Sequence, residues 1–148
     1  MDRKNMLGKI LVTGATGNVG GAVATELIAR GVSVRALVRD QGRAAVLAEA
    51  GVETVVGDMD SPETLDAALS GVSAVFLATS VNPNSTVQVR NVIAAALRAG
   101  RPHIVRLGAA RPSADGPILG RMHAESDSDL VGSGLPYTLL HPGSFMQN

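Results

Sequence analysis

Apolar residues along this chain alternate between two kinds of segment. Short apolar runs, each bounded by glycine, proline or polar residues, predict buried strands at residues 9–13, 32–38, 52–56, 72–79, 103–107 and 136–140. The intervening segments have helical spacing or composition, and most end at a glycine. They predict helices at residues 18–30, 42–50, 62–70, 86–99 and 119–131. Before the third helix, Ser61 is expected to be the N-cap and Pro62 the first helical residue.

Strands that alternate with helices indicate parallel βαβ units with right-handed crossovers. The strands are nearly continuous apolar runs, which is typical of a sheet covered on both faces. We therefore predict an α/β fold: a Rossmann-type, doubly wound parallel sheet of strand order 3-2-1-4-5-6 in a three-layer α/β/α domain. The length of 148 residues fits one domain, spanning residues 1–148.

A glycine-rich loop, GATGNVG, follows the first strand and opens the first helix. Gly14 is suited to the tight turn, Gly17 to the close approach of a diphosphate, and Gly20 to close packing of helix and sheet. The helix N-terminus would offer free N–H groups and a partial positive charge to phosphates. This context predicts dinucleotide binding. The alternative is a tight turn without a ligand, since 17 of the residues are glycine.

The end of the second strand discriminates between the two nicotinamide cofactors. Arg39 stands where a basic side chain would bind the extra phosphate of NADP, and Arg43 follows one helical turn later. The sequence thus favours NADP(H) over NAD(H). Two alternatives remain open: Asp40 accepts from the ribose hydroxyls of NAD instead, or Arg39 and Asp40 form a solvated pair.

Two further strand ends lie at the same edge of the predicted sheet. After the third strand, Asp58 could accept from the adenine amino group and Met59 could cover the ring, unless Asp58 serves only in a turn. The fourth strand ends in Ala78, Thr79 and Ser80, at the carboxyl edge where open α/β sheets bind ligands.

Composition narrows the function further. Lys+Arg and Asp+Glu are 13 each and aromatic residues are 2%, so we expect no nucleic-acid partner. Cysteine is absent and the three histidines lack paired-ligand spacing, so no metal site is expected. The sequence shows neither an apolar run of the roughly 18 residues that a membrane helix needs nor a signal peptide. We therefore expect no membrane partner and a cytoplasmic location.

Four segments together carry a resemblance to a known family: ILVTGATGNVG, LVRD, VVGDMDSPETLDAALSGVSAVFLAT and SGLPYTLLHPGSFMQN. The chain resembles, from Lys9 onward, the NmrA-like branch of atypical short-chain dehydrogenases/reductases. Within that branch it is most similar to NAD(P)H quinone oxidoreductases and azoreductase-like proteins.

The resemblance implies an NADPH-dependent oxidoreductase that transfers hydride to a quinone-like or other small electron-poor acceptor. Other members of the group are non-catalytic sensors of the NADP pool that bind a protein partner, and this alternative remains open. An epimerase-like domain is a third reading. The implied cofactor-binding residues are Gly14, Thr16, Gly17, Asn18, Val19, Arg39, Asp58, Met59, Ala78 and Thr79, with Pro142, Gly143 and Phe145 near the nicotinamide.

The sequence departs from the family pattern in two respects. The Tyr-x-x-x-Lys pair is missing: His141 stands four residues after Tyr137, which we interpret as structural. His123 occupies the position of a catalytic lysine in related reductases, and could polarise a carbonyl or donate a proton. Its alternative is a plain helix-surface histidine.

The second departure is length, because such proteins run to roughly twice this chain and their C-terminal half supplies most of the substrate pocket. If the chain ends here, the free edge beside the sixth strand would favour a homodimer.

Overall fold

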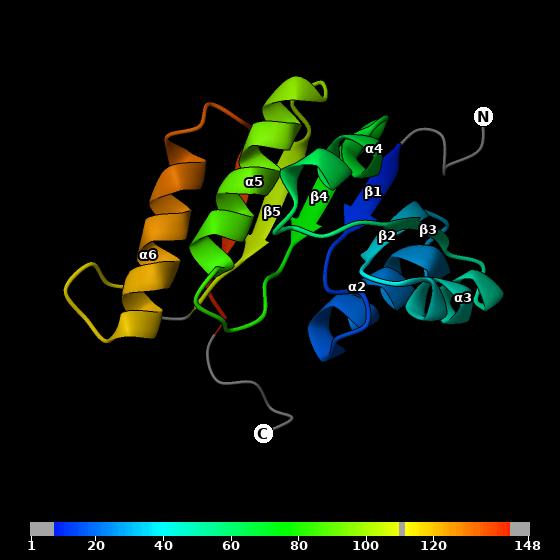
Figure 1. Ribbon diagram of the computed structural model, residues 1–148, viewed down its shortest axis with the longest axis horizontal. Coiled ribbons are helices and arrows are strands. Elements are labelled where there is room, and N and C mark those ends of the chain that lie inside the picture. The colour runs from blue at the N-terminus through cyan, green and yellow to red at the C-terminus, as the bar shows by residue number, and fades with distance from the viewer. Residues whose placement is uncertain (1–7, 110–111, 143–148) are drawn as a thin grey trace.

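The computed structural model describes residues 8–109 and 112–142 (Figure 1). Its centre is a six-stranded sheet, parallel throughout, in the order β3-β2-β1-β4-β5-β6. The strands are β1 (Lys9–Val12), β2 (Ser33–Val38), β3 (Glu53–Val56), β4 (Val72–Leu77), β5 (His103–Leu107) and β6 (Tyr137–Leu140). The predicted Rossmann-type strand order is thereby confirmed.

Helices cover both faces of this sheet. One face carries α2 (Asn18–Ala29) and α3 (Gln41–Glu49), and the other carries α4 (Leu65–Leu69), α5 (Ser85–Arg98) and α6 (Ile118–Val131) (Figure 1). A short 3-10 helix, η1 (Pro62–Thr64), leads into α4. The arrangement is the predicted three-layer α/β/α architecture.

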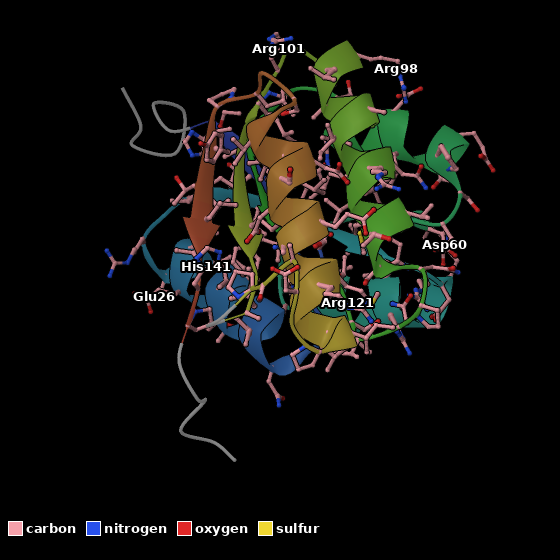
Figure 2. The ribbon with its side chains drawn as sticks, turned by 90° about the vertical axis from the view of Figure 1, so that its left-hand side faces the viewer. Glu26, Asp60, Arg98, Arg101, Arg121 and His141 are labelled. Carbon is pink, nitrogen blue, oxygen red and sulfur yellow. The ribbon has the colours of Figure 1, made fainter. Side chains whose placement is uncertain are left out.

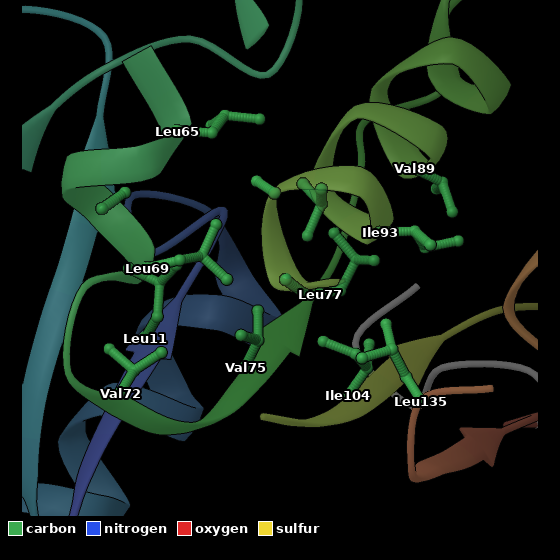
Figure 3. Close-up of a cluster of buried hydrophobic side chains, with 14 of the residues drawn as sticks. Leu11, Leu65, Leu69, Val72, Val75, Leu77, Val89, Ile93, Ile104 and Leu135 are labelled. Carbon is green, nitrogen blue, oxygen red and sulfur yellow. The ribbon is translucent and has the colours of Figure 1, made fainter. Parts of the chain in front are cut away.

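Two apolar cores, one on each face of the sheet, explain why it is stable. Leu11 of β1 belongs to a buried cluster that includes Leu69 of α4 and Ile93 of α5 (Figure 3). Leu130 of α6 is part of the same cluster. Val12, the neighbour of Leu11, faces the other way and packs in the core beneath α2 and α3. Since successive strand side chains point to opposite faces, a strand between two helical layers must be apolar at nearly every position.

The central strands end earlier than predicted because a buried side chain replaces part of the strand pairing. Thr13 is fully buried beyond the end of β1. Its Oγ1 accepts a hydrogen bond from the Ala78 amide at 2.8 Å and donates to the Ala78 carbonyl at 2.9 Å. The hydroxyl thus ties the segment after β1 to the segment after β4, where the sheet opens toward the candidate site.

Ser61 precedes a helix as predicted, but its side chain makes no capping hydrogen bond. Thr64 holds this turn instead. Its hydroxyl donates to the Ser61 carbonyl at 2.8 Å and accepts from the Asp58 amide at 2.9 Å. The turn after Pro62 is a 3-10 helix, so the third predicted helix is divided into η1 and α4.

Within residues 8–109 and 112–142, no helix has the length and apolar character needed to cross a membrane. The same residues contain no group of three or more histidine and acidic side chains arranged to hold a metal ion.

Candidate functional site

A cleft of about 420 Å³ opens at the carboxyl ends of the central strands. Its walls are the loop between β1 and α2, the end of β2, the turn after β3 and the segment after β4. In a doubly wound sheet this is the edge where the strand order reverses and ligands bind. The sequence-predicted residues are brought together here from segments more than 60 positions apart, as the Thr13–Ala78 bond shows.

The glycine loop has the geometry that its sequence predicts. Gly14 has φ +67°, a left-handed conformation that favours glycine. The Gly17 amide donates to the Gly14 carbonyl at 2.9 Å and closes the turn. At Gly20, a Cβ atom would lie 2.1 Å from the Gly14 carbonyl oxygen. The first turn of α2 therefore presses against the loop backbone, and only glycine fits at residue 20.

The N-terminus of α2 has no side-chain cap. Its N-cap residue is Gly17, which is extended and makes no capping bond, whereas Asp40 caps α3 by accepting from the Arg43 amide at 2.8 Å. The first N–H groups of a helix have no partner inside the helix. At α2 they lie beside the cleft, which Val19 and Gly20 line. The N-terminus of α2 can therefore bind an anion, whereas at the N-terminus of α3 the Asp40 carboxylate already takes that place.

The end of β2 separates the two candidate cofactor-discriminating side chains. Arg39 lines the cleft, and its guanidinium has no hydrogen bond or ion pair with any residue that the structure describes. The Asp40 carboxylate is committed to the start of α3, and Arg43 Nε lies 3.5 Å from its Oδ2. Asp40 is therefore a helix cap in this structure, and it does not line the cleft.

The turn after β3 forms another wall, lined by Gly57, Asp58 and Met59. Asp58 Oδ1 accepts from the Asp60 amide at 2.8 Å, so its carboxylate performs the turn role that was the alternative for this residue. Met59 packs against the core, and its carbonyl accepts from Asn91 of α5 at 2.8 Å. The main chain of this wall is thus fixed from two sides.

The opposite wall is the segment after β4, with Ala78, Thr79 and Ser80. Thr13 fixes Ala78, and the Ser80 hydroxyl accepts from the Asn82 amide group at 3.1 Å. Thr79 and Ser80 also line a smaller hollow beyond the cleft, together with His123 of α6. The two cavities adjoin along this segment.

Most of the predicted cofactor-binding residues line the cleft: Gly14, Thr16, Gly17, Val19, Arg39, Asp58, Met59, Ala78, Thr79 and Ser80. Asn18 is the exception in the glycine loop, since it lines a separate hollow along α2. Pro142 does not line the cleft. Gly143 and Phe145 lie outside the described residues. That these residues bind a cofactor remains a prediction.

Sequence reasoning missed several residues that shape the cleft. Leu37, Gly57 and Leu107 line it, and Thr13 supports it from below. A Cβ atom at residue 57 would lie 3.0 Å from Leu37 Cδ1 and 3.2 Å from Thr64 Oγ1, so glycine lets β3 turn tightly there. Their position along the sequence could have identified them, because each lies at or just beyond the carboxyl end of a strand.

His123 is not a plain surface histidine. It is half-buried, and its Nδ1 lies 3.0 Å from Nη2 of the buried Arg106. Burial lowers the pKa of His123, the positive charge of Arg106 lowers it further, and Asp127 opposes both effects. Tyr137, by contrast, is exposed at the start of β6 and lies outside the cleft.

Comparison with known proteins agrees with this geometry. Residues 14–148 match the model of a family described as NAD(P)H-binding. This chain belongs to that NAD(P)H-binding family. It is 39% identical, over 94% of its length and 49% of the relative, to the NAD(P)H azoreductase of Xenophilus azovorans.

Solved structures give the same result. The triphenylmethane reductase of Citrobacter sp., complexed with NADP(H), is 34% identical with a TM-score of 0.83 over 94% of this chain and 50% of that one. The NADPH-dependent quinone oxidoreductase QOR2 of Escherichia coli, complexed with NADPH, is 33% identical with the same TM-score and the same coverage. The predicted resemblance is confirmed, and the chain spans about half the length of these relatives.

Proposed function

We propose that this family member acts as an NADPH-dependent oxidoreductase that transfers hydride to a quinone-like or other small electron-poor acceptor. The observation that carries the proposal is the cleft rim. There, the N-terminus of α2, which has no side-chain cap, and the guanidinium of Arg39, which has no partner among residues 8–109 and 112–142, lie on one cavity. An anion-binding helix end together with a free cation suits a dinucleotide with an additional phosphate.

The residues of the cleft fit such a cofactor. In the loop from Gly14 to Gly17, two of the four residues are glycine and the other two, Ala15 and Thr16, are small. A diphosphate can therefore approach the loop backbone closely. The free N–H groups of Val19 and Gly20 would hold the diphosphate, and Arg39 would hold the phosphate on the ribose. Met59 offers an apolar surface for the adenine.

NADPH, when bound, supplies a hydride, so a quinone acceptor gains two electrons and one hydrogen and then takes up one proton. The reduced quinone is a stabilised anion and needs little help from an acid, which accords with the missing Tyr/Lys pair. In this proposal His123 donates a hydrogen bond to the acceptor oxygen from the adjoining hollow. Ser80, which lines both cavities, is the second candidate donor.

The names of the relatives support this acceptor class. An azoreductase, a triphenylmethane reductase and a quinone oxidoreductase each act on a compound whose conjugated system accepts electrons. The proposal carries this shared chemistry over to the present chain, without choosing among the three.

Calorimetric titration of the Arg39→Gln variant with NADPH and NADH tests the cofactor preference. A charge-assisted hydrogen bond contributes about 1.5–3 kcal/mol, so NADPH affinity should fall roughly 10-fold to 150-fold while NADH affinity stays the same. Arg30→Gln is the matched control, because Arg30 is paired with Glu26 on the exposed surface of α2. Equal losses for both cofactors would contradict phosphate recognition by Arg39.

Oxidation of NADPH in the presence of a panel of quinones tests the reaction itself. Acceptor-dependent oxidation supports the reductase. Tight NADPH binding without oxidation by any acceptor would contradict it and would favour the sensor alternative, in which the oxidised and reduced cofactors bind with different affinity.

A further inference from the structure

Four polar side chains form a cluster at the carboxyl end of β5, beside the hollow that His123 lines. Arg106 of β5 and Asp127 of α6 are only 2% and 8% exposed. Arg106 Nη1 pairs with Asp127 Oδ1, and Asp127 Oδ2 lies 2.8 Å from His141 Nε2. His141 follows β6, and Figure 2 shows it near the end of that strand. His123 completes the cluster through its contact with Arg106.

The direction of each hydrogen bond follows from the chemistry of the groups. A guanidinium has only donors, so Arg106 Nη2 must donate to His123 Nδ1, 3.0 Å away. Nδ1 is therefore the acceptor nitrogen, and the ring hydrogen of His123 lies on Nε2. At the other end an ionised carboxylate only accepts, so His141 donates to Asp127 from its own Nε2.

The cluster also disfavours a positive charge on His123. Protonation of Nδ1 would place two donors face to face across the contact with Arg106. Burial and the Arg106 charge lower the pKa of His123, His141 contributes in the same direction, and Asp127 partly opposes them. Arg106 itself is held in its buried position by the carboxylate of Asp127.

Close packing leaves Arg106 little freedom to release the histidine. A Cβ atom at residue 108 would lie 2.8 Å from Arg106 Nη1 and 3.3 Å from His141 Cδ2. Gly108 therefore lets β5 carry the main chain past the cluster without displacing it. His123 Nε2, on the other edge of the ring, has no hydrogen-bond partner among the described residues.

We propose that Arg106, held by Asp127 and His141, is a positioning residue that keeps His123 neutral with its hydrogen on Nε2. The histidine is then a hydrogen-bond donor toward the hollow shared with Thr79 and Ser80, and not a cationic acid. An acceptor oxygen placed there would receive a hydrogen bond from a neutral imidazole. The role of this donor in turnover rests on the proposed function, but the protonation state of His123 does not.

Long-range ¹H–¹⁵N correlation of the histidine rings tests the proposal on the chain without cofactor. The chain has only three histidines, and the His123→Gln variant identifies the signals of His123. We expect the Nε2–H tautomer between pH 6 and 8 and a titration midpoint below the roughly 6.5 of an unperturbed histidine. A His123 that carries its hydrogen on Nδ1, or that titrates at or above this value, would overturn the proposal.

A paired variant tests the role of Arg106. Arg106→Met combined with Asp127→Leu removes both buried charges together, which folded proteins tolerate better than the loss of one. The midpoint of His123 should rise and the Nδ1–H form should appear. His103→Gln is the matched control, since His103 contacts Thr138 and not the cluster. An unchanged His123 spectrum in the paired variant would contradict positioning by Arg106.

These measurements stay separate from the proposed function. If NADPH fails to bind, the tautomer of His123 can still be measured, and only the reductase proposal is lost. If reduction occurs, the acid limb of the pH profile of kcat/KM should move to higher pH in the paired variant, because His123 must lose its proton to act as the neutral donor.

Discussion

Two parts of the carboxyl edge of the sheet are built in different ways. At β1 and β2 the cleft wall is formed mainly by main-chain conformation, with Gly14 and Gly20 close in the sequence and in contact in space. At β5 and β6 the polar cluster is formed by side chains from β5, from α6 and from the residue that follows β6, and its partners are 14, 17 and 21 positions apart. The first region depends on the absence of side chains, whereas the second depends on matched charges.

This difference sets how each region responds to substitution. A wall of backbone loses its shape when a Cβ atom is added, whereas a cluster of buried charges loses stability when one partner is removed.

The largest effect is expected in the polar cluster. Arg106→Met leaves the Asp127 carboxylate buried without its cation, which should lower the free energy of unfolding by about 3–5 kcal/mol. The paired variant with Asp127→Leu should recover most of that loss. Urea unfolding of the three proteins measures both values. If the single variant were as stable as the paired one, the cluster would not behave as a buried ion pair.

Substitution in the glycine-rich loop after β1 should change cofactor affinity. In Gly20→Ala the new Cβ atom would lie 2.1 Å from the Gly14 carbonyl oxygen. Because that oxygen belongs to the main chain, the loop backbone itself must move to relieve the overlap. NADPH affinity should fall roughly 5-fold to 150-fold, for a cost of about 1–3 kcal/mol. Gly21→Ala is the control, because its Cβ atom would lie 3.2 Å from the Ala15 carbonyl oxygen and needs far less movement. Similar NADPH affinity in both variants would argue against this role of Gly20.

A smaller loss of stability is expected for substitution of Asp40. Asp40→Ala removes the cap of α3 and should lower stability by about 1 kcal/mol, as capping residues generally do. The ratio of NADPH to NADH affinity should stay unchanged, because the carboxylate serves the helix. Thermal unfolding and calorimetry measure the two quantities. A selective change in NADH affinity would restore Asp40 as a ribose-binding residue.

The smallest expected effect is on how the stability of the protein depends on pH. The pKa of His123 is lower in the folded state than in the unfolded chain, so the unfolded chain binds more protons between the two values. Stability contributed by this difference is present above about pH 6.5 and declines as the pH falls toward the folded-state pKa. The fall in urea midpoint between pH 7 and 5.5 should be shallower in His123→Gln.

Sequence alone predicted the strand order and most of the cleft. It could do so because apolar runs and glycine positions act locally: they determine where strands form, where helices begin and which loop lies at the carboxyl edge. It was less successful where two local roles compete. Asp40 has the chemistry either to cap a helix or to bind a ribose, and it caps α3. Ser61 has the chemistry of a cap, but the turn is held by the Thr64 hydroxyl, which bonds to the Ser61 carbonyl.

The polar cluster illustrates what only the tertiary structure decided. The sequence drew attention to His123 by its position, but nothing local indicates that Arg106 is buried or that it would contact His123. Their partnership arises because β5, α6 and β6 pack side by side, and because a buried guanidinium must find a carboxylate. The sequence determined the backbone that can receive a dinucleotide. Packing of distant segments decided that a buried guanidinium would contact His123 beside the cleft.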